Sequence, residues 1–179
     1  MFYAIKGEIY ALDPMKLLLE NGGIIYEINI TLKTFNALKS SQNAFVFLSQ
    51  IIREDSHKLV GFCDELERDM FLKLLKVSGI GVKVALAILS TFSAQEFIQI
   101  IQGKNITQLQ RVPGVGAKSA SKIILELSGI LVQESSQNNL AKEALLNLGF
   151  KPAQIDKALK ELDQSLSTPD LIKRALQIL

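Results

Sequence analysis

The residues best suited to chemistry in this sequence are the glycines and lysines of two similar segments. Residues 77–85 read VSGIGVKVA and residues 112–120 read VPGVGAKSA, so the pattern Gly-x-Gly-x-Lys occurs twice. Glycines followed by lysine and serine are typical of loops that hold phosphate groups. The phosphate would belong either to a nucleotide or to a nucleic acid. The spacing of the glycines and the lysine helps to distinguish the two.

That spacing disfavours a nucleotide site. A Walker A loop requires glycine directly before lysine, whereas Ala117 separates Gly116 from Lys118. The segment also joins two helical patterns instead of following a strand, so it does not fit the dinucleotide-binding fingerprint. A small enzyme that holds a nucleotide in these loops is kept as an alternative, which detectable ATP binding would support.

The spacing fits a helix-hairpin-helix motif instead. Its glycines permit positive φ and close approach of a ligand, while the residue between them, Ile80 or Val115, is expected to turn inward. The backbone amides then lie at the start of the next helix, where unpaired N–H groups and the helix dipole favour an anion. Lys83 and Lys118 add charge at matching positions. Such contacts follow a DNA backbone and are independent of base sequence.

Glycines also make tight helix connections without any ligand, so one hairpin alone would leave the function open. The charge distribution favours DNA. Residues 71–129 hold seven Lys/Arg and two Asp/Glu, whereas residues 1–70 hold seven and ten. The whole chain has a net charge of only +2, so its positive charge is concentrated around the two hairpins. We therefore predict that this segment binds DNA.

The order of predicted elements indicates an α+β multidomain protein. Residues 1–63 contain five strand patterns with one short helix, in residues 31–39, after the third. This is the element order of an OB-fold β-barrel. Residues 64–130 are predicted to form an all-α tandem helix-hairpin-helix domain, with a capping box that starts at Ser93.

The C-terminal part is predicted to be a separate small domain. Residues 131–139, LVQESSQNN, are polar and predict a linker. Residues 140–179 predict a three-helix bundle, with one helix ended by Gly149, one opened at Pro152 and one capped by Thr168-Pro169.

Glu54 and Asp55 lie in a predicted turn between the last two strands of the barrel. Acidic residues in turns are ordinarily just solvated, and taken alone these two favour that interpretation. The functional alternative is that they repel phosphates and keep DNA strands apart.

Composition argues against several classes of protein. With 48% hydrophobic and 21% charged residues the chain is globular. It contains no apolar run of about 20 residues, and its N-terminus is charged, so we expect a cytoplasmic protein with no membrane partner. One cysteine, Cys63, excludes an internal disulfide and a multi-cysteine zinc site.

The hairpin segment holds only Glu96 and Glu126 as carboxylates, too few for the metal cluster of a nuclease. It also lacks the aspartate expected of a helix-hairpin-helix glycosylase, because no aspartate lies between Asp69 and Asp156. We predict no catalytic residue, no metal site and no cofactor.

Several segments in combination resemble the RuvA family, the Holliday-junction-binding subunits of the bacterial branch-migration complex. They are GGIIYEI in the barrel, REDSHKLVGF at the acidic turn, GIGVKVALAILS and PGVGAKSASKIILEL in the hairpins, and EALLNLGFKP near the C-terminus. The resemblance covers essentially the whole chain. One departure is the segment 131–139, which is shorter than the linker common in the family.

The resemblance implies a homotetramer, with an octamer as the alternative assembly, that holds a four-way junction open for recombination and DNA repair. It also implies that Glu54 and Asp55 form an acidic pin at the crossover, in place of the ordinary solvated turn. The residues implied to contact the DNA backbone are Gly79, Gly81, Lys83, Gly114, Gly116, Lys118, Ser119 and Lys122.

The family resemblance also implies protein partners. The C-terminal bundle would bind the motor ATPase RuvB through an apolar surface around Leu145, Leu148 and Phe150, which could equally be core residues. The RuvC resolvase would be a further partner. ATP and magnesium would be used by the motor. The alternative function is a general structure-specific DNA-binding accessory subunit of a repair nuclease or glycosylase, which would bind linear duplex as well as a junction.

Overall fold

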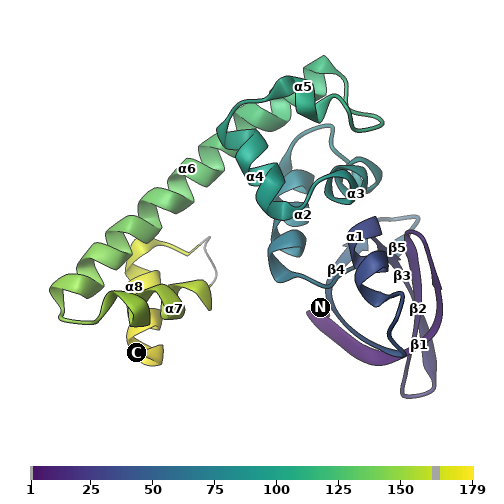
Figure 1. Ribbon diagram of the computed structural model, residues 1–179, viewed down its shortest axis with the longest axis horizontal. Helices are drawn as coiled ribbons and strands as arrows, with labels where there is room; N and C mark the ends of the chain where they lie inside the picture. The colour runs from purple at the N-terminus through teal and green to yellow at the C-terminus, as the bar shows by residue number, and fades with distance from the viewer. Residues whose placement is uncertain (1, 163–165) are drawn as a thin grey trace. The chain divides into compact units, whose positions relative to one another are not determined.

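The computed structural model describes residues 2–162 and 166–179, and for residues 132–137 it describes the backbone alone. The chain divides into two compact units, Met1–Leu127 and Ser128–Leu179. The first unit contains a β-barrel and a set of short helices, and the second is helical (Figure 1).

The N-terminal part is a closed barrel of five strands in the order β1-β2-β3-β5-β4. All neighbouring strands are antiparallel except β3 and β5, which are parallel. This order, with a helix between the third and fourth strands, confirms the predicted OB-fold. The elements are β1 Ala4–Asp13, β2 Lys16–Asn21, β3 Ile24–Ile30, α1 Leu32–Leu38, β4 Asn43–Ile52 and β5 His57–Phe62.

Alternating residues of these strands fill the barrel. Leu17 and Leu19 of β2 are fully buried, while Lys16 is exposed and Leu18 is half-buried, as expected for a strand with one inward face. Gly7 lets two strands approach closely, because a Cβ atom there would lie 2.0 Å from the Glu20 carbonyl oxygen. The barrel core consists of Leu17, Leu19, Ile28, Ile30, Leu38, Ala44, Val46 and Leu48.

The helices of the first unit form the predicted pair of hairpins with a connecting helix. The capping box of α4 is confirmed, because Ser93 and Glu96 each accept a hydrogen bond from the other's backbone N–H. The helices are α2 Glu65–Lys76, α3 Val82–Thr91, α4 Ala94–Gln102, α5 Ile106–Leu109 and the beginning of α6 Ala117–Asn147.

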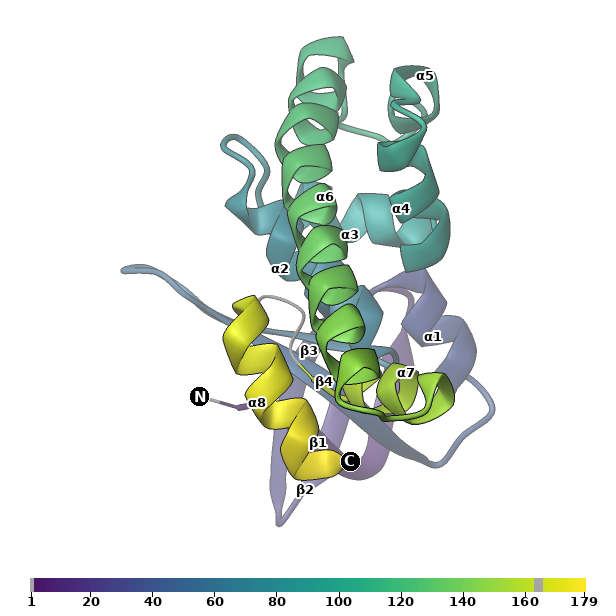
Figure 2. The same cartoon turned by 90° about the vertical axis from the view of Figure 1, so that its left-hand side faces the viewer.

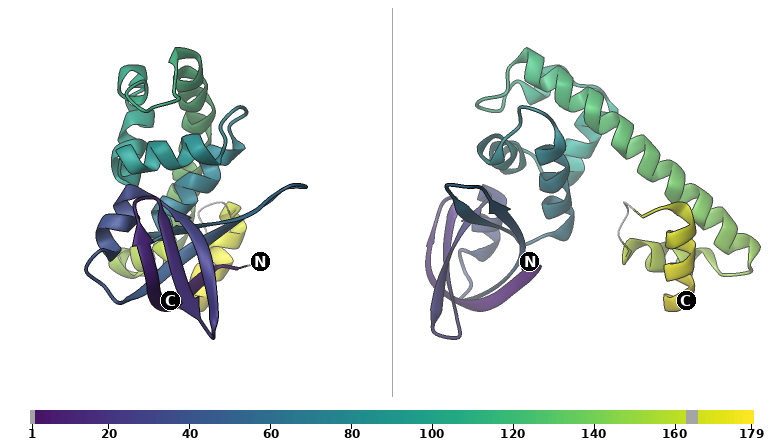
Figure 3. Two further views of the ribbon diagram at one scale, coloured as in Figure 1. Left: turned by 90° about the vertical axis from the view of Figure 1, so that its right-hand side faces the viewer. Right: turned by 180° about the vertical axis from the view of Figure 1, so that it is seen from behind.

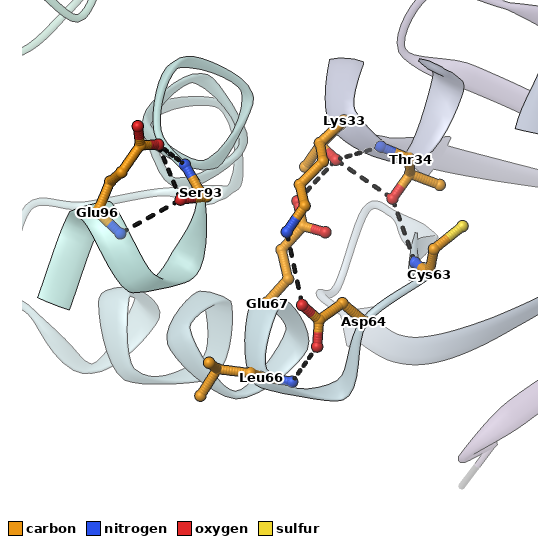
Figure 4. Close-up of polar contacts among 9 residues, drawn as sticks. Lys33, Thr34, Cys63, Asp64, Leu66, Glu67, Ser93 and Glu96 are labelled. Atoms are coloured by element: carbon orange, nitrogen blue, oxygen red, sulfur yellow. Dashed lines mark hydrogen bonds and ion pairs between the residues drawn. The ribbon is translucent and has the colours of Figure 1, made fainter. Parts of the chain in front are cut away.

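Polar contacts join α2 to the barrel (Figure 4). Thr31 Oγ1 at the start of α1 donates a 2.7 Å hydrogen bond to Glu67 Oε1, and Arg68 Nε donates a 2.9 Å bond to the Leu48 carbonyl. Glu67 is only 1% exposed, and among the described residues its Oε2 has no hydrogen-bond partner. Burial raises the pKa of the Glu67 carboxyl, against the opposite effect of the Thr31 bond. A buried acid therefore lies where the barrel meets the hairpin helices.

The segment 131–139 was predicted to be a turn-rich linker, and its secondary structure differs from that prediction. It lies inside α6, which is drawn as one unbroken helix in Figure 2. Its residues are polar, but it contains neither proline nor glycine, so nothing in it interrupts the backbone hydrogen-bond pattern. The helix ends at Asn147 instead, and Gly149 follows with a φ of 93°.

The second unit packs the end of α6 against α7 Pro152–Lys160 and α8 Thr168–Ile178, which confirms the predicted three-helix bundle. Pro152 opens α7 as predicted, but the N-cap of α8 is Ser167, whose side chain accepts a bond from the Asp170 N–H. The core consists of Ala141, Leu145, Ile155, Ala158, Leu159, Leu171 and Ala175.

Within the described ranges, no helix by itself has the length and apolar character needed to cross a bilayer. Only α3 and α4 taken together pass by length and composition, and the two are bent by 97°.

Candidate nucleic-acid interface

The two hairpins have the same internal hydrogen bonds, thirty-five residues apart. The Val77 N–H donates to Leu74, and the Val112 N–H donates to Leu109, both at 3.1 Å. In the turn that follows, the Ile80 N–H donates to the Val77 carbonyl in the first hairpin. The Val115 N–H donates to the Val112 carbonyl in the second, and both bonds are 3.0 Å long. The repeat seen in the sequence is therefore a repeat of backbone geometry.

The residue between the glycines anchors each hairpin, as predicted. Ile80 and Val115 are both buried, as are Val77 and Val112, so apolar side chains on the inner side hold the turn in place. The first glycine of each hairpin has a left-handed backbone conformation. Gly79 and Gly114 have φ values of 89° and 87°.

The second glycine of each hairpin starts the next helix. Gly81 has an ordinary φ of −98° and is the N-cap of α3, so positive φ is needed only at the first glycine. Its carbonyl accepts the Ala85 N–H at 3.0 Å, and the Gly116 carbonyl accepts the Ala120 N–H at 2.9 Å. A Cβ atom at either glycine would meet no atom within 4 Å. Packing does not require glycine at these positions, whereas close approach of a ligand does.

The helices that follow Gly81 and Gly116 begin with backbone amides of the kind that can bind an anion. The first N–H groups of a helix have no partner within it, and the helix dipole makes this end positive. Lys83 and Lys118 are exposed in the first turn of α3 and α6. Each site thus combines amides with one cation, which suits a phosphate group.

The two hairpins lie next to each other within the first unit. A Cβ atom at Gly114 would lie 3.7 Å from Val84 Cγ2, so the second hairpin packs beside the first turn of α3. Lys83 directly precedes Val84. The structure therefore brings together residues of both predicted sites.

The remaining predicted DNA contacts lie on α6. Lys122 is exposed one turn beyond Lys118, and its ammonium forms a 3.9 Å ion pair with Glu126. Such a weak, exposed pair leaves the lysine able to bind another anion. Ser119 is half-buried beside Lys118.

Sequence reasoning missed a second pair of cations at the hairpins. Lys76 directly precedes the first hairpin and Arg111 directly precedes the second, and both are exposed. They have the same thirty-five-residue offset as Lys83 and Lys118, so an alignment of the repeat with itself would have found them. Lys76 also has a purely structural role available, because a cation in the last turn of a helix stabilises it.

Glu54 and Asp55 form the tip of the β4–β5 hairpin (Figure 3, left). The pairing of the strands reaches Ile52 and His57. Beyond it, the Arg53 N–H donates to the Ser56 carbonyl at 2.8 Å, so the two acids are the central residues of a tight turn. Both are exposed. The carboxylates therefore extend away from the barrel core.

Leu145 occupies a core position, which is the alternative given above for the three apolar residues. Leu145 is fully buried in the core of the second unit, because it lies on the side of α6 that packs against α7 and α8. Phe150 packs partly against the same core, while Leu148 is 61% exposed. Of the three predicted residues, Leu148 is therefore the one that is exposed to a partner.

No cluster of three or more His, Cys, Asp or Glu side chains that would suit a metal ion occurs in the residues that the structure describes.

Comparisons with known proteins match three parts of the chain. Residues 1–61 match the RuvA N terminal domain, residues 71–128 match a SAM-like helix-hairpin-helix tandem, and residues 141–179 match the RuvA C-terminal domain. These matches correspond to the barrel, the two hairpins and the helical bundle described above.

Full-length relatives agree with these matches, and each bears the name Holliday junction branch migration complex subunit RuvA. The protein of Wolinella succinogenes is 42% identical over 185 residues, covering 99% of this chain and 97% of the relative. That of Helicobacter acinonychis is 40% identical over 179 residues, covering 99% and 98%. That of Sulfurimonas denitrificans is 39% identical over 187 residues, covering 100% and 98%.

Proposed function

This chain belongs to the RuvA family, and we propose that it binds four-way DNA junctions without regard to base sequence, as the non-catalytic subunit of a branch migration complex. The observation that carries the proposal is the duplicated hairpin, with open glycines and an exposed lysine at the start of each following helix. Two such sites side by side suit consecutive phosphates of a DNA backbone.

In this proposal the backbone amides after Gly81 and Gly116 bind phosphate oxygens, and Lys83 and Lys118 add charge. The other proposed contacts lie beside them and are Gly79, Gly114, Ser119 and Lys122. None of these groups is placed to distinguish one base from another, so affinity comes from the phosphates and falls as salt rises.

Glu54 and Asp55 are proposed to act as an acidic pin at the crossover. Their exposure at the end of a long hairpin supports this role. Carboxylates repel phosphates, so the pin would keep strands apart at the point where they exchange. With several subunits around one junction, the pins would bring their charge together at its centre.

The assembly and partners are also part of the proposal. Four copies would surround one junction, or eight in two facing tetramers. The C-terminal unit would bind the motor ATPase RuvB, which uses ATP and magnesium, and the RuvC resolvase would act on the same junction. Leu148 is the proposed motor contact, because its exposed apolar side chain is available to a partner. The proposed location is the cytoplasm.

A branch-migration assay with purified RuvB tests the function. A labelled synthetic junction with homologous arms is incubated with this chain, RuvB, ATP and magnesium. Conversion to duplex products only when both proteins are present is the expected result. Conversion by RuvB at the same rate with and without this chain would contradict the proposal.

A further inference from the structure

The acidic hairpin carries basic residues whose role the proposed pin does not explain. Arg53 and Lys58 flank the turn that contains Glu54 and Asp55, and both are exposed. The two cations balance the two carboxylates, so these four residues together carry no net negative charge. A hairpin that served only to repel phosphates would gain nothing from these cations.

The pairing of β4 with β5 places the two cations on one face of the hairpin. Arg53 and Ser56 exchange both backbone hydrogen bonds and are therefore directly opposite each other. Lys58 is two residues beyond Ser56 and opposite Ile51, so its side chain is on the same face as that of Arg53. Diagonal neighbours of this kind are about 7–8 Å apart, and their Cβ atoms are somewhat closer.

The other face of the hairpin has a different character. Ile52 is directly opposite His57, and Ile52 is 70% exposed. His57 contacts Gln50, which is on this second face as well. The hairpin thus has an acidic tip, one face with Arg53 and Lys58, and one face without lysine or arginine.

Both cations are available to a ligand. In the part of the chain that the structure describes, neither Arg53 nor Lys58 has an ion-pair or side-chain hydrogen-bond partner, although Glu54 and Asp55 are their near neighbours. At about 3.4 Å per strand residue, Lys58 is about 10 Å from the tip. This is comparable to the Debye length of about 8–10 Å at 0.10–0.15 M salt. A DNA strand beside the hairpin is therefore repelled by the carboxylates at the tip and attracted by the cations of the basic face.

We propose that Arg53 and Lys58 form a phosphate-binding face on the pin, which holds one DNA strand at the crossover while the acidic tip repels the next. The inference rests on the proposed junction binding and adds a binding site to it. The ligand is a nucleic-acid phosphate, because two exposed cations on one face, about one nucleotide apart, suit a backbone, and Arg53 can bind phosphate in a bidentate manner.

The test compares Arg53→Gln, Lys58→Gln and the double variant with the wild-type chain. Fluorescence titration measures the affinity for a four-way junction and for a linear duplex of equal length, between 50 and 200 mM salt. Lys157→Gln on α7 is the charge-matched control, because Lys157 is exposed and outside the first unit. Thermal unfolding checks that each variant is folded.

Losing two phosphate contacts should lower the slope of log affinity against log salt by about 1.8. Across this fourfold range of salt, wild-type junction affinity should then fall about tenfold more than that of the double variant. Duplex binding should be unchanged, because a duplex has no crossover. An unchanged junction slope, or an equal loss on junction and duplex, would overturn the inference. Failure of wild-type protein to prefer the junction would instead count against the proposed function.

Discussion

Gly79 and Gly114 have nearly the same left-handed backbone, with φ values of 89° and 87°, at equivalent positions of two hairpins. Each precedes a buried anchor and a second glycine that opens a helix. Because the equivalence extends to individual hydrogen bonds, the two hairpins should respond alike to equivalent substitutions.

The two glycines of a hairpin should respond differently to alanine. Gly114→Ala places a side chain at positive φ and should cost about 1–2 kcal/mol of stability. Gly116→Ala should cost less stability, namely the loss of a better N-cap residue, since its Cβ would meet no atom within 4 Å, but it should weaken DNA binding because that Cβ lies where a phosphate is proposed to approach. Thermal unfolding and junction titration measure the two effects. Full affinity in a folded Gly116→Ala protein would contradict the backbone contact.

Lys83→Gln and Lys118→Gln should each reduce the salt dependence of junction binding. Each lysine is proposed to neutralise one phosphate, so the log-log slope should fall by about 0.9 for either variant and about twice that for both. Titration over a range of salt gives the slopes, with Lys157→Gln as control. A reduction for one lysine and none for the other would show that the two hairpins are not equivalent sites.

Neutralising the pin should separate binding from branch migration. Glu54→Gln with Asp55→Asn removes repulsion of phosphates without changing side-chain size, so junction affinity should be unchanged or higher. The rate of branch migration with RuvB should change. The role of the pin would be refuted by unaltered branch migration in a variant that binds the junction normally.

Glu67→Gln should change how stability depends on pH. Burial raises the pKa of Glu67 in the folded chain, so the folded state keeps the proton to higher pH than the unfolded state, whose value is about 4.5. Its stabilising contribution is therefore fully present below pH 4.5 and is lost as pH rises through the folded pKa. From pH 4 to pH 7 the free energy of unfolding should fall for the wild type relative to Glu67→Gln. If the difference in free energy of unfolding between the two proteins stayed constant over this range, the raised pKa of Glu67 would be contradicted.

Two leucines of the C-terminal unit should separate fold from partner binding. Leu145→Ala removes a fully buried side chain and should cost about 2–5 kcal/mol of stability. Leu148→Ala should leave unfolding unchanged and weaken the proposed contact with RuvB. Calorimetry of the variants and a pull-down with purified RuvB measure both, and normal RuvB binding by Leu148→Ala would remove that residue from the interface.

The sequence predicts those parts of the molecule that are determined by local periodicity. The short apolar run that contains Leu17 and Leu19 predicts a strand, and the pair Ser93 and Glu96 predicts a helix start, because these local patterns are typical of the two elements. The Gly-x-Gly-x-Lys repeat likewise predicts both hairpins, including their buried anchors.

Other features depend on contacts between distant residues, and local pattern does not reveal them. The polar segment 131–139 has the composition of a linker, yet the helices that flank it continue through it. Leu145 and Leu148 are both apolar and close together, and only the packing of α7 and α8 determines which is buried. Glutamate is usually found at the surface, but Thr31 and the barrel bury Glu67.

The central claim is that the duplicated hairpins bind the backbone of a four-way junction. Gel-shift competition tests it most directly, with a labelled junction challenged by unlabelled junctions of unrelated sequence and by linear duplex of the same length. Equal competition by every junction and much weaker competition by duplex is the predicted result. Competition by duplex as strong as by junction would contradict the claim and would favour a general DNA-binding accessory subunit.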